Sequence, residues 1–353
     1  MLLVPFCGNS TAGFRFKVLS SKFRATFNIQ HSTFNLESAS GAALDKGRAG
    51  WQFGGVIQAK LDQLRALLRS YGSCLVAYSG GVDSVFLACV AREVLGERSL
   101  AAIADSASLP RRELAEALEI AAAFQIPVRV LRTDEFNNPD YLANPANRCY
   151  FCKHELFEEL EPLAKAEGFA VIAYGENASD VGDFRPGAKA AAEFQVRAPL
   201  KEVGLTKAEI RELSAQLGLP TADKPQMACL SSRVPHGEAV TPEKLRMIEE
   251  AEYVLKDLGF YDVRVRLHEL SFEFRVSSFE LKPKSSPAET QNYLARIEVG
   301  VAELARLQDS ETLARVTEAL KKIGFAEVTV DLQGYRRGSL NPAAGVSAQS
   351  EKT

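Results

Sequence analysis

The stretch Ser79–Ser84, SGGVDS, has the residue types that bind phosphate. Two adjacent glycines allow backbone N–H groups to face an anion without a Cβ atom in the way. The apolar run Cys74–Ala77 predicts a buried strand before the stretch, and Val85–Leu95 predicts a helix whose positive dipole end points at the same place. The stretch lacks the Lys-Ser/Thr pair of a Walker A motif and the third glycine of a dinucleotide fingerprint. The alternative is a glycine-rich turn that only joins the strand to the helix.

Three cysteines could bind a metal or carry sulfur. Cys149 and Cys152 have the C-x-x-C spacing, which serves zinc sites, redox pairs and iron–sulfur clusters alike. Cys229 lies beside hydroxyl side chains and Arg233, surroundings that favour the thiolate form. A disulfide between Cys149 and Cys152 and a structural zinc site stay open as alternatives. The fourth ligand of such a zinc site would be His154 or His236.

Charged residues follow the predicted strands at the places where a parallel sheet binds ligands. Leu100–Ala104, Val128–Leu131 and Phe169–Tyr174 predict further strands, and Arg111–Phe124 and Tyr150–Ala166 predict the helices between them. This alternation predicts an α/β fold with a doubly wound parallel sheet, whose ligands lie beyond the carboxyl ends of the strands. The candidate binding residues at such ends, or in the charged loop after Tyr174, are Asp105, Gly175, Asp180, Asp183, Arg185 and Lys189.

An internal repeat marks a second, smaller region past Thr241. Leu255–Leu267 and Leu320–Leu332 each contain the end of a predicted helix, a glycine suited to the left-handed C′ position, and a strand. With Leu294–Val299 as an additional strand, the pattern predicts a small α+β domain. A ferredoxin-like arrangement is one candidate for it. The glycines are Gly259 and Gly324.

The strand Val263–Arg266 carries two arginines on one face. Arg264 and Arg266 alternate with valines, so their guanidinium groups lie about 7 Å apart on the same side of the strand. Such a pair suits a phosphate or a carboxylate. Ordinary solvated surface arginines fit the spacing equally well.

Composition sets limits on the class of protein. A length of 353 residues predicts two domains, and a net charge of −3 gives no general basic field for nucleic acid. No apolar run approaches the roughly 20 residues of a membrane span. Residues 1–36 contain arginines and lysines with no acidic residue before Glu37, which is typical of an organelle transit peptide. A merely disordered leader is the alternative.

Several motifs together resemble one family. Ser79–Ser84 is similar to the SGGxDS loop of PP-loop ATP pyrophosphatases, which adenylate a substrate and release pyrophosphate. With four further motifs in the same order, the chain resembles the LarE family, ATP-dependent sulfur transferases of nickel-pincer cofactor synthesis, from about Ile57 to Asn341. The four motifs are Asp105–Leu114, Asp183–Gly187, Ala228–Arg233 and Val263–Arg266.

The resemblance implies a reaction and its cofactors. ATP would adenylate a carboxylate of pyridinium-3,5-dicarboxylate mononucleotide, and sulfur would then displace AMP to give a thiocarboxylate. ATP and Mg²⁺ are the implied cofactors, with Asp83 helping to organise the metal. Cys229 falls on the sulfur-bearing cysteine, Glu252 on a functional glutamate, and Arg264 and Arg266 on phosphate-contacting arginines. The residues expected to bind ATP or the substrate are Ser79, Gly80, Gly81, Asp83, Ser84, Asp105, Gly175, Asp180, Asp183, Arg185, Lys189, Arg233, Arg264 and Arg266.

The chain departs from the family pattern in two places. One subgroup, which gives up the cysteine's own sulfur, has a tryptophan near the position of Cys149. The cysteines of this chain are instead similar to the subgroup in which three cysteines, here Cys149, Cys152 and Cys229, hold a [4Fe–4S] cluster. The second departure is an extra segment, about Leu270–Tyr293, which is either an exposed loop or a gene-model error such as a retained intron.

The expected domains are a transit peptide and linker at 1–50, a PP-loop domain at 51–240, an α+β domain at 241–341 and a disordered tail at 342–353. The leader favours a plastid over a mitochondrion, because it is rich in Ser, Thr and Phe rather than strongly patterned with Arg. We expect a small-molecule mononucleotide substrate, no nucleic-acid or membrane partner, and a homo-oligomer. The alternative functions are tRNA thiolation, amidation as in NAD or GMP synthetases, and a non-enzymatic nucleotide-binding module.

Overall fold

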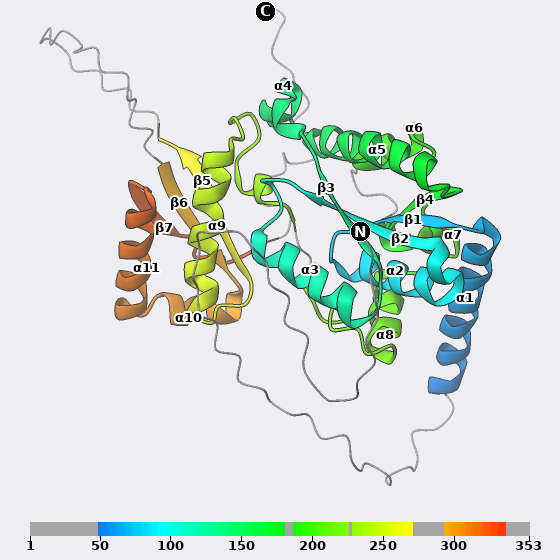
Figure 1. Ribbon diagram of the computed structural model, residues 1–353. Helices are drawn as coiled ribbons and strands as arrows, with labels where there is room; N and C mark the ends of the chain where they lie inside the picture. Colours follow the sequence, from blue (N-terminus) through cyan, green and yellow to red (C-terminus); the bar gives the residue numbers. More distant parts are fainter. Residues whose placement is uncertain (1–48, 181–185, 226–227, 271–292, 337–353) are drawn as a thin grey trace, which may run out of the picture. The chain divides into compact units, whose positions relative to one another are not determined.

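The computed structural model describes residues 49–180, 186–225, 228–270 and 293–336. These residues form a four-stranded sheet followed in sequence by a three-stranded sheet (Figure 1). The expected transit peptide up to residue 48, the tail, and Asp183 and Arg185 lie outside the described residues. So does nearly all of the extra segment. The expected domain division near residue 240 stays a prediction.

The first sheet is entirely parallel, with the strand order β3-β2-β1-β4. Strand β1 lies inside the sheet, and its first residue, Cys74, pairs with Ser99 on one side and Val171 on the other. The predicted doubly wound α/β fold is therefore confirmed. The strands are β1 (Cys74–Ala77), β2 (Ser99–Asp105), β3 (Val128–Arg132) and β4 (Val171–Tyr174).

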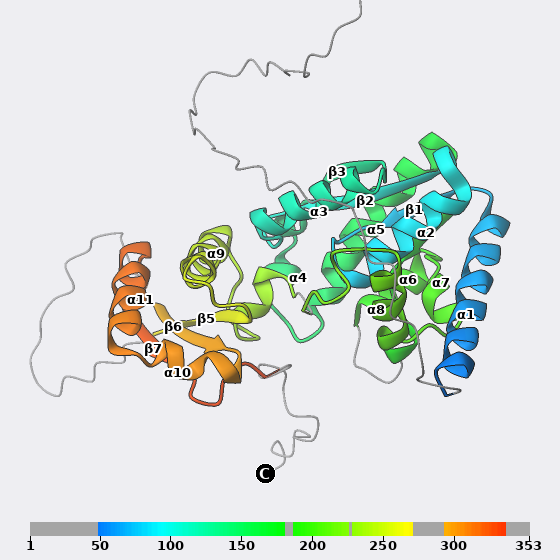
Figure 2. The same cartoon turned by 90° about the horizontal axis from the view of Figure 1, so that it is seen from below.

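Helices cover both faces of this sheet (Figures 1 and 2). Because side chains alternate along a strand, Cys74 and Val76 belong to one apolar cluster and Leu75 to the other. The first cluster includes side chains of α1 (Ala49–Tyr71), α2 (Val82–Leu95), α3 (Arg111–Ala123) and α8 (Lys207–Gln216). The second cluster includes side chains of α5 (Arg148–Glu167) and α6 (Pro186–Glu193). This half of the chain also contains two short helices, α4 (Pro139–Leu142) and α7 (Pro199–Glu202).

Two helices begin earlier than the sequence predicts. Helix α2 starts at Val82 rather than Val85, because Gly81 takes an extended conformation and serves as its N-cap. Asp83 and Ser84 therefore lie in the first helical turn rather than in a loop. Helix α5 starts at Arg148 rather than Tyr150, so Cys149 is also helical.

The second sheet has the strand order β5-β6-β7, antiparallel between β5 and β6 and parallel between β6 and β7. The predicted repeat corresponds to two helix–strand units, and Gly259 and Gly324 have positive φ values of 85° and 121° after their helices. The described residues supply three strands of this sheet, one fewer than a ferredoxin-like domain has, so the ferredoxin-like arrangement stays a prediction. The elements are α9 (Pro242–Asp257), β5 (Val263–Glu269), β6 (Tyr293–Val299), α10 (Leu304–Leu307), α11 (Ser310–Ile323) and β7 (Glu327–Val330).

Among the described residues, none of the helices combines the length and the apolar character that crossing a bilayer requires.

Candidate functional site

The turn between β1 and α2 requires glycine at one position. Gly80 has a φ of +70°, and a Cβ atom added there would lie 2.6 Å from Cβ of Ala117 in α3. Tyr78, just before the turn, donates a hydrogen bond from its hydroxyl to the carbonyl oxygen of Ala117 at 2.9 Å. The turn is thus held directly against α3, which fixes its shape.

Hydroxyl groups inside the turn hold it in place while the start of α2 stays open. The backbone N–H of Ser79 donates to Oγ of Ser84 at 3.1 Å, and the two hydroxyl oxygens are 3.0 Å apart. In the part of the chain that the structure describes, no side chain caps the N-terminus of α2 at Gly81. Open backbone N–H groups at the positive end of a 14-residue helix form a site for phosphate oxygens.

Asp83 lies beside a cation that comes from far along the chain. Nζ of Lys207, at the start of α8, donates to Oδ2 of Asp83 at 2.6 Å. Gly175, directly after β4, lies so close that an added Cβ would be 3.1 Å from Cβ of Asp83 and 3.0 Å from the backbone nitrogen of Ser84. The ends of β1 and β4 and the start of α8 therefore meet at the turn.

A cavity of about 470 Å³ joins this turn to two of the cysteines. Its wall includes Ser79, Gly81 and Asp83 at one part and Cys152 and Cys229 at another. The predicted site residues Gly175 and Asp180 also line it. An adjoining cavity of about 350 Å³ shares the turn and adds Ser84 and Cys149. Phosphate-binding groups and thiols thus face common space, as ligand sites of this size usually combine apolar walls with a few polar groups.

Buried polar contacts bring the C-x-x-C pair next to Cys229. Arg148, only 4% exposed, donates from Nη1 to the carbonyl oxygen of Ser231 at 2.9 Å. The hydroxyl of Tyr141 lies 2.7 Å from Oγ of Ser231. These contacts join the start of α5 to the segment after Cys229. Arg148 and Ser231 are 83 positions apart in the sequence.

The three thiols influence one another electrostatically. Burial raises the pKa of Cys149 and of Cys152, and the nearby Cys229 thiol raises both further. All three are free cysteines, so Cys149 and Cys152 do not form the disulfide bond of the alternative interpretation. Within the described ranges, no group of three or more His, Cys, Asp or Glu side chains is arranged to hold a metal ion. The described side chains therefore do not form the zinc site of the alternative either.

Arg233 and Glu252 form a fully buried ion pair. Nε and Nη2 of Arg233 donate to the two carboxylate oxygens at 2.8 and 3.0 Å. Burial pushes the pKa of Glu252 upward, but the charge of Arg233 and its hydrogen bonds outweigh burial and hold that pKa below its usual value. Nη1 of Arg233 also donates to the carbonyl oxygen of Cys229 at 3.0 Å. The pair therefore supports the backbone at Cys229, and neither residue lines the two cavities.

The two strand arginines are buried, so the solvated alternative is wrong. Arg264 and Arg266 are 3% and 5% exposed. Arg266 donates from Nε and Nη2 to Glu298 at 3.1 and 2.9 Å, and from Nη1 to the carbonyl oxygen of Ser232 at 2.8 Å. Arg264 lies over the ring of Tyr335 at 4.7 Å. Burial and the charge of Arg233 lower the pKa of Arg264. Neither arginine lines the cavities beside the turn.

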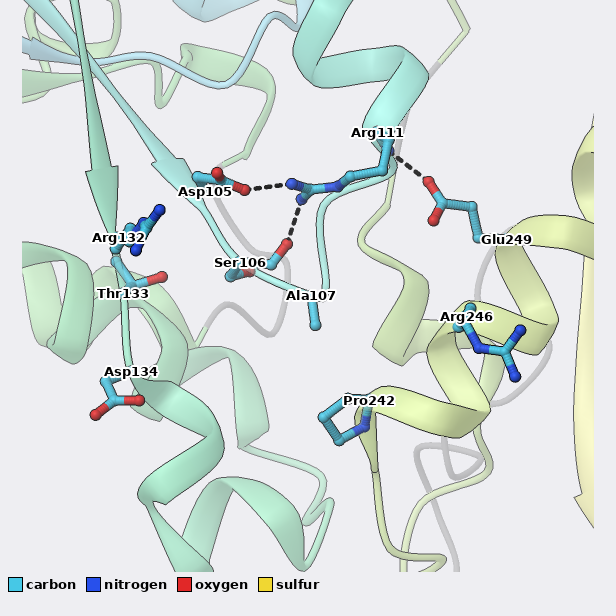
Figure 3. Close-up of a pocket in the computed structure, with 10 residues that line it drawn as sticks. All are labelled: Asp105, Ser106, Ala107, Arg111, Arg132, Thr133, Asp134, Pro242, Arg246 and Glu249. Atoms are coloured by element: carbon cyan, nitrogen blue, oxygen red, sulfur yellow. Dashed lines mark hydrogen bonds and ion pairs between the residues drawn. The ribbon is translucent and has the colours of Figure 1, made fainter. Parts of the chain in front are cut away.

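A more open pocket of about 720 Å³ lies beside these cavities (Figure 3). Asp105, the last residue of β2, forms an ion pair with Arg111 there. The backbone N–H of Arg111 in turn donates to Glu249 of α9 (Figure 3). The structure thus places Asp105 in an ion pair at the outer pocket rather than in the cavity with the turn.

The structure separates Lys189 from the other candidates and adds residues that the sequence did not indicate. Lys189 lies in α6, its side chain is 75% exposed, and it pairs with Glu193 at 3.9 Å. In contrast, Lys153, Lys207 and Glu135 line the cavity with the turn and the thiols. The C-x-x-C pair could have pointed to Lys153, which follows Cys152 directly, but nothing local pointed to the other two.

Comparisons with known proteins identify relatives of this chain. No protein-family model matches the chain. An uncharacterized protein of Synechocystis is 40% identical over 81% of this chain and 98% of its own length. Pyridinium-3,5-bisthiocarboxylic acid mononucleotide synthase of Lactiplantibacillus plantarum is 30% identical over 80% of this chain and 94% of its own length. A GMP synthase of Brucella melitensis is 25% identical over 70% of this chain and 55% of its own length.

The parallel sheet, the SGGVDS turn and these relatives define an ATP pyrophosphatase-type sulfurtransferase of the PP-loop superfamily. Within that class, the chain belongs to the LarE family. The similarity to GMP synthase reflects the common superfamily and goes no further.

Proposed function

We propose that this enzyme adenylates a carboxylate of pyridinium-3,5-dicarboxylate mononucleotide and then exchanges AMP for sulfur. One observation carries the proposal: the phosphate-binding turn at Ser79 and the thiols of Cys152 and Cys229 line the same cavity. A single bound acceptor can therefore lie between ATP and sulfur. The printed name of the Lactiplantibacillus plantarum relative, a bisthiocarboxylic acid mononucleotide synthase, supports this acceptor.

The two steps assign work to different parts of the cavity. In the first, a carboxylate oxygen attacks the α-phosphorus of ATP, the bond to the β-phosphate oxygen breaks, and pyrophosphate leaves with the electron pair. The backbone N–H groups at the start of α2 and the cation of Lys207 would bind that leaving group. In the second, a sulfur nucleophile attacks the carboxyl carbon and AMP leaves with the bonding pair.

Asp83 is the residue that would hold Mg²⁺. Magnesium usually takes one or two protein carboxylates together with substrate phosphates, so a single aspartate at the turn suits it. When bound, the ion would neutralise charge on the phosphates. Lys207 would then exchange its contact with Asp83 for a phosphate oxygen.

The test is to identify the products of ATP. With the dicarboxylate mononucleotide as acceptor, we expect AMP and pyrophosphate, and we expect Asp83→Asn to reduce pyrophosphate release at least a hundredfold, in the range found when one charge-stabilising group is lost. Asp140→Asn is the matched control, because Asp140 is exposed and lies outside the cavity. Release of ADP instead of AMP would reject the assignment.

For the sulfur source, we propose that Cys149, Cys152 and Cys229 together bind a [4Fe–4S] cluster. Their convergence supports this, since the free thiols of Cys152 and Cys229 line one cavity and that of Cys149 lines the adjoining cavity. The side chains as described are not arranged as a metal site, so binding requires them to rotate toward one another. When bound through three thiolates, such a cluster leaves one iron open, which could carry an additional sulfide.

Anaerobic reconstitution tests the cluster. We expect iron and acid-labile sulfide in the full-length protein, and loss of both iron and sulfur transfer in each of the three Cys→Ala variants while adenylation persists. Cys89→Ala is the control, because burial and the charge of Glu93 raise the pKa of that thiol in α2, away from the cavity. Zinc in place of iron, or full sulfur transfer by Cys149→Ala, would contradict the proposal.

We also propose import into an organelle, with a plastid preferred, and assembly into a homo-oligomer. The basic, Ser/Thr-rich leader supports the first proposal. A fusion of residues 1–50 to a fluorescent protein should reach the organelle, and retention in the cytosol would refute it. Light scattering of the purified chain measures the oligomer directly.

A further inference from the structure

Glu135 is a buried carboxylate whose charge has no partner in the described part of the chain. It follows β3 in the 3-10 helix Glu135–Asn137 and is 2% exposed. Oε1 accepts a hydrogen bond from Oγ of Ser108 at 3.2 Å. Oε2 is buried and has no hydrogen-bond partner among the described residues, and no cation there lies within ion-pair distance.

A buried carboxylate without a compensating partner destabilises the folded protein. Moving a carboxylate out of water costs several kcal/mol, and proteins normally compensate with a cation or a full set of hydrogen bonds. One hydrogen bond from a hydroxyl does not compensate a full charge. An unsatisfied buried group of this kind is typical of a site that a ligand completes.

The position of Glu135 indicates which ligand this is. It lines the 470 Å³ cavity that also contains the phosphate-binding turn and the thiols. The 3-10 helix that carries Glu135 packs against α5, which carries Cys152, so the carboxylate lies at the thiol end of the cavity. The acceptor carboxyl carbon must reach that end for sulfur to attack it, and the ring that carries the carboxyl group must lie nearby.

The other walls of the cavity favour an aromatic cation over a metal ion. Ile103, Leu109 and Leu156 give the cavity apolar surface. The Mg²⁺ that accompanies ATP is assigned to Asp83 at the turn, and the described residues contain no group of three acidic, His or Cys side chains that would hold a further metal ion at Glu135. A ring with delocalised positive charge can take apolar contact here together with the carboxylate of Glu135, in a cavity whose lining also carries Asp83, Glu113, Asp180, Lys153 and Lys207.

We propose that Glu135 binds the positively charged ring of the acceptor and selects an N-substituted pyridinium over a neutral ring. The inference rests on the proposed function, because it identifies part of the acceptor site. Ser108 positions the carboxylate, and Glu135 itself does not take part in bond making or breaking.

The test compares two ligands of the same shape and different charge. N-methylpyridinium-3,5-dicarboxylate and 5-methylbenzene-1,3-dicarboxylate differ in ring charge, because N⁺ replaces one ring carbon. With the full-length protein in a calorimeter, we expect the cation to bind at least tenfold more tightly, because the ring charge and the buried carboxylate attract each other where little water screens them. In Glu135→Gln, which keeps the shape and the acceptor for Ser108, the ratio should fall toward one while ATP affinity stays unchanged.

Two further variants separate the charge from its setting. Ser108→Ala removes the hydrogen bond that positions the carboxylate and keeps the charge, so a preference for the cation should persist at a ratio below that of the wild-type protein. Glu119→Gln changes an exposed glutamate of α3 outside the cavity and should change nothing. Thermal unfolding of each variant identifies loss of fold, and if Glu135→Gln does not fold, Glu135→Asp, which keeps the charge and withdraws it, should give an intermediate ratio.

Three results would overturn the inference. They are an unchanged ratio in Glu135→Gln, no preference in the wild-type protein, or a weaker Mg²⁺ affinity in Glu135→Gln that identifies the residue as a metal ligand. Failure of the proposed function looks different, because then the mononucleotide would yield no pyrophosphate even in the wild-type protein, whatever the ring preference in binding.

Discussion

At the scale of single residues, the site depends on close approaches that only glycine permits. Gly80 combines a left-handed conformation with contact against α3, and Gly175 lies against the first turn of α2. At both positions, atoms of a neighbouring helix lie where the Cβ atom of any other residue would have to fit. Close packing against α3, and of the end of β4 against the first turn of α2, therefore fixes the shape of the turn.

Gly80→Ala should destabilise the fold more than the same change at another left-handed glycine. Gly72 has nearly the same φ, +73°, but nothing lies within 4 Å of an added Cβ, whereas at Gly80 the new atom meets Ala117 at 2.6 Å. We expect about 1 kcal/mol of lost unfolding free energy at Gly72 from the conformation, and about 1–3 kcal/mol more at Gly80 from overpacking. Urea unfolding measures both, and equal losses would show that the contact with α3 yields freely.

The buried pair Arg233–Glu252 should make stability depend on pH. Because the pKa of Glu252 is lower in the folded chain than its ordinary value of 4.5, the unfolded chain takes up the proton first as pH falls. The stabilisation is therefore fully present above pH 4.5 and is lost as pH falls through the folded pKa.

Glu252→Gln measures this effect. Breaking a buried pair leaves Arg233 unpaired, so we expect a loss of about 3–5 kcal/mol at pH 7. The difference from wild type should shrink below pH 4.5 in urea unfolding. Glu250→Gln is the control, because its i,i+4 pair with Arg246 is largely exposed and is worth about 0.3–0.5 kcal/mol. A difference that grows in acid would contradict the sign.

At the scale of elements, helix α9 supplies the missing cap of helix α3. The N-cap of α3 is Pro110, which makes no side-chain cap. Glu249 instead accepts from the backbone N–H of Arg111, and the hydroxyl of Tyr253 accepts from that of Arg112 at 2.9 Å. The first turn of α3 therefore has its donors satisfied by a helix more than a hundred residues later.

Tyr253→Phe should weaken this junction while keeping the ring beneath Arg112. Loss of a capping acceptor costs about 1 kcal/mol. We also expect faster hydrogen exchange at the amide of Arg112. Tyr261→Phe is the control, because Tyr261 is 66% exposed and should change stability by less than about 0.5 kcal/mol. Unchanged exchange at Arg112 would show that water replaces the hydroxyl without cost.

The elements themselves were largely predictable, and their mutual contacts were not. Apolar runs such as Cys74–Ala77 become strands because they are long enough for a strand and bounded by turn residues, and the glycine after each helix end is a local signal. Lys207 reaches Asp83 across 124 positions, which no local pattern contains. For Arg264 and Arg266, alternation gave the face of the strand but not the elements that bury it.

At the scale of the whole molecule, the segment between β5 and β6 should be replaceable. Glu269 pairs directly with Tyr293, so the described chain enters and leaves the segment at neighbouring positions. Substituting Asn-Gly for residues 270–292 should close a two-residue hairpin. We expect unchanged adenylation and a stability equal to wild type or up to about 2 kcal/mol higher, because loop closure becomes less costly. An insoluble or inactive product would show that the segment is structural.

The cap that α9 gives to α3 also constrains how the protein is made. Arg111 and Glu249 are 138 positions apart, so at about 5–20 residues per second a ribosome needs on the order of ten seconds to synthesise the second after the first. During that interval the nascent chain has β1, β2 and α3 outside the ribosome with the first turn of α3 uncapped. The nucleotide-binding half would thus complete its fold only near the end of translation, and a ribosome that stalls before Tyr253 would leave that half open to chaperones and proteases.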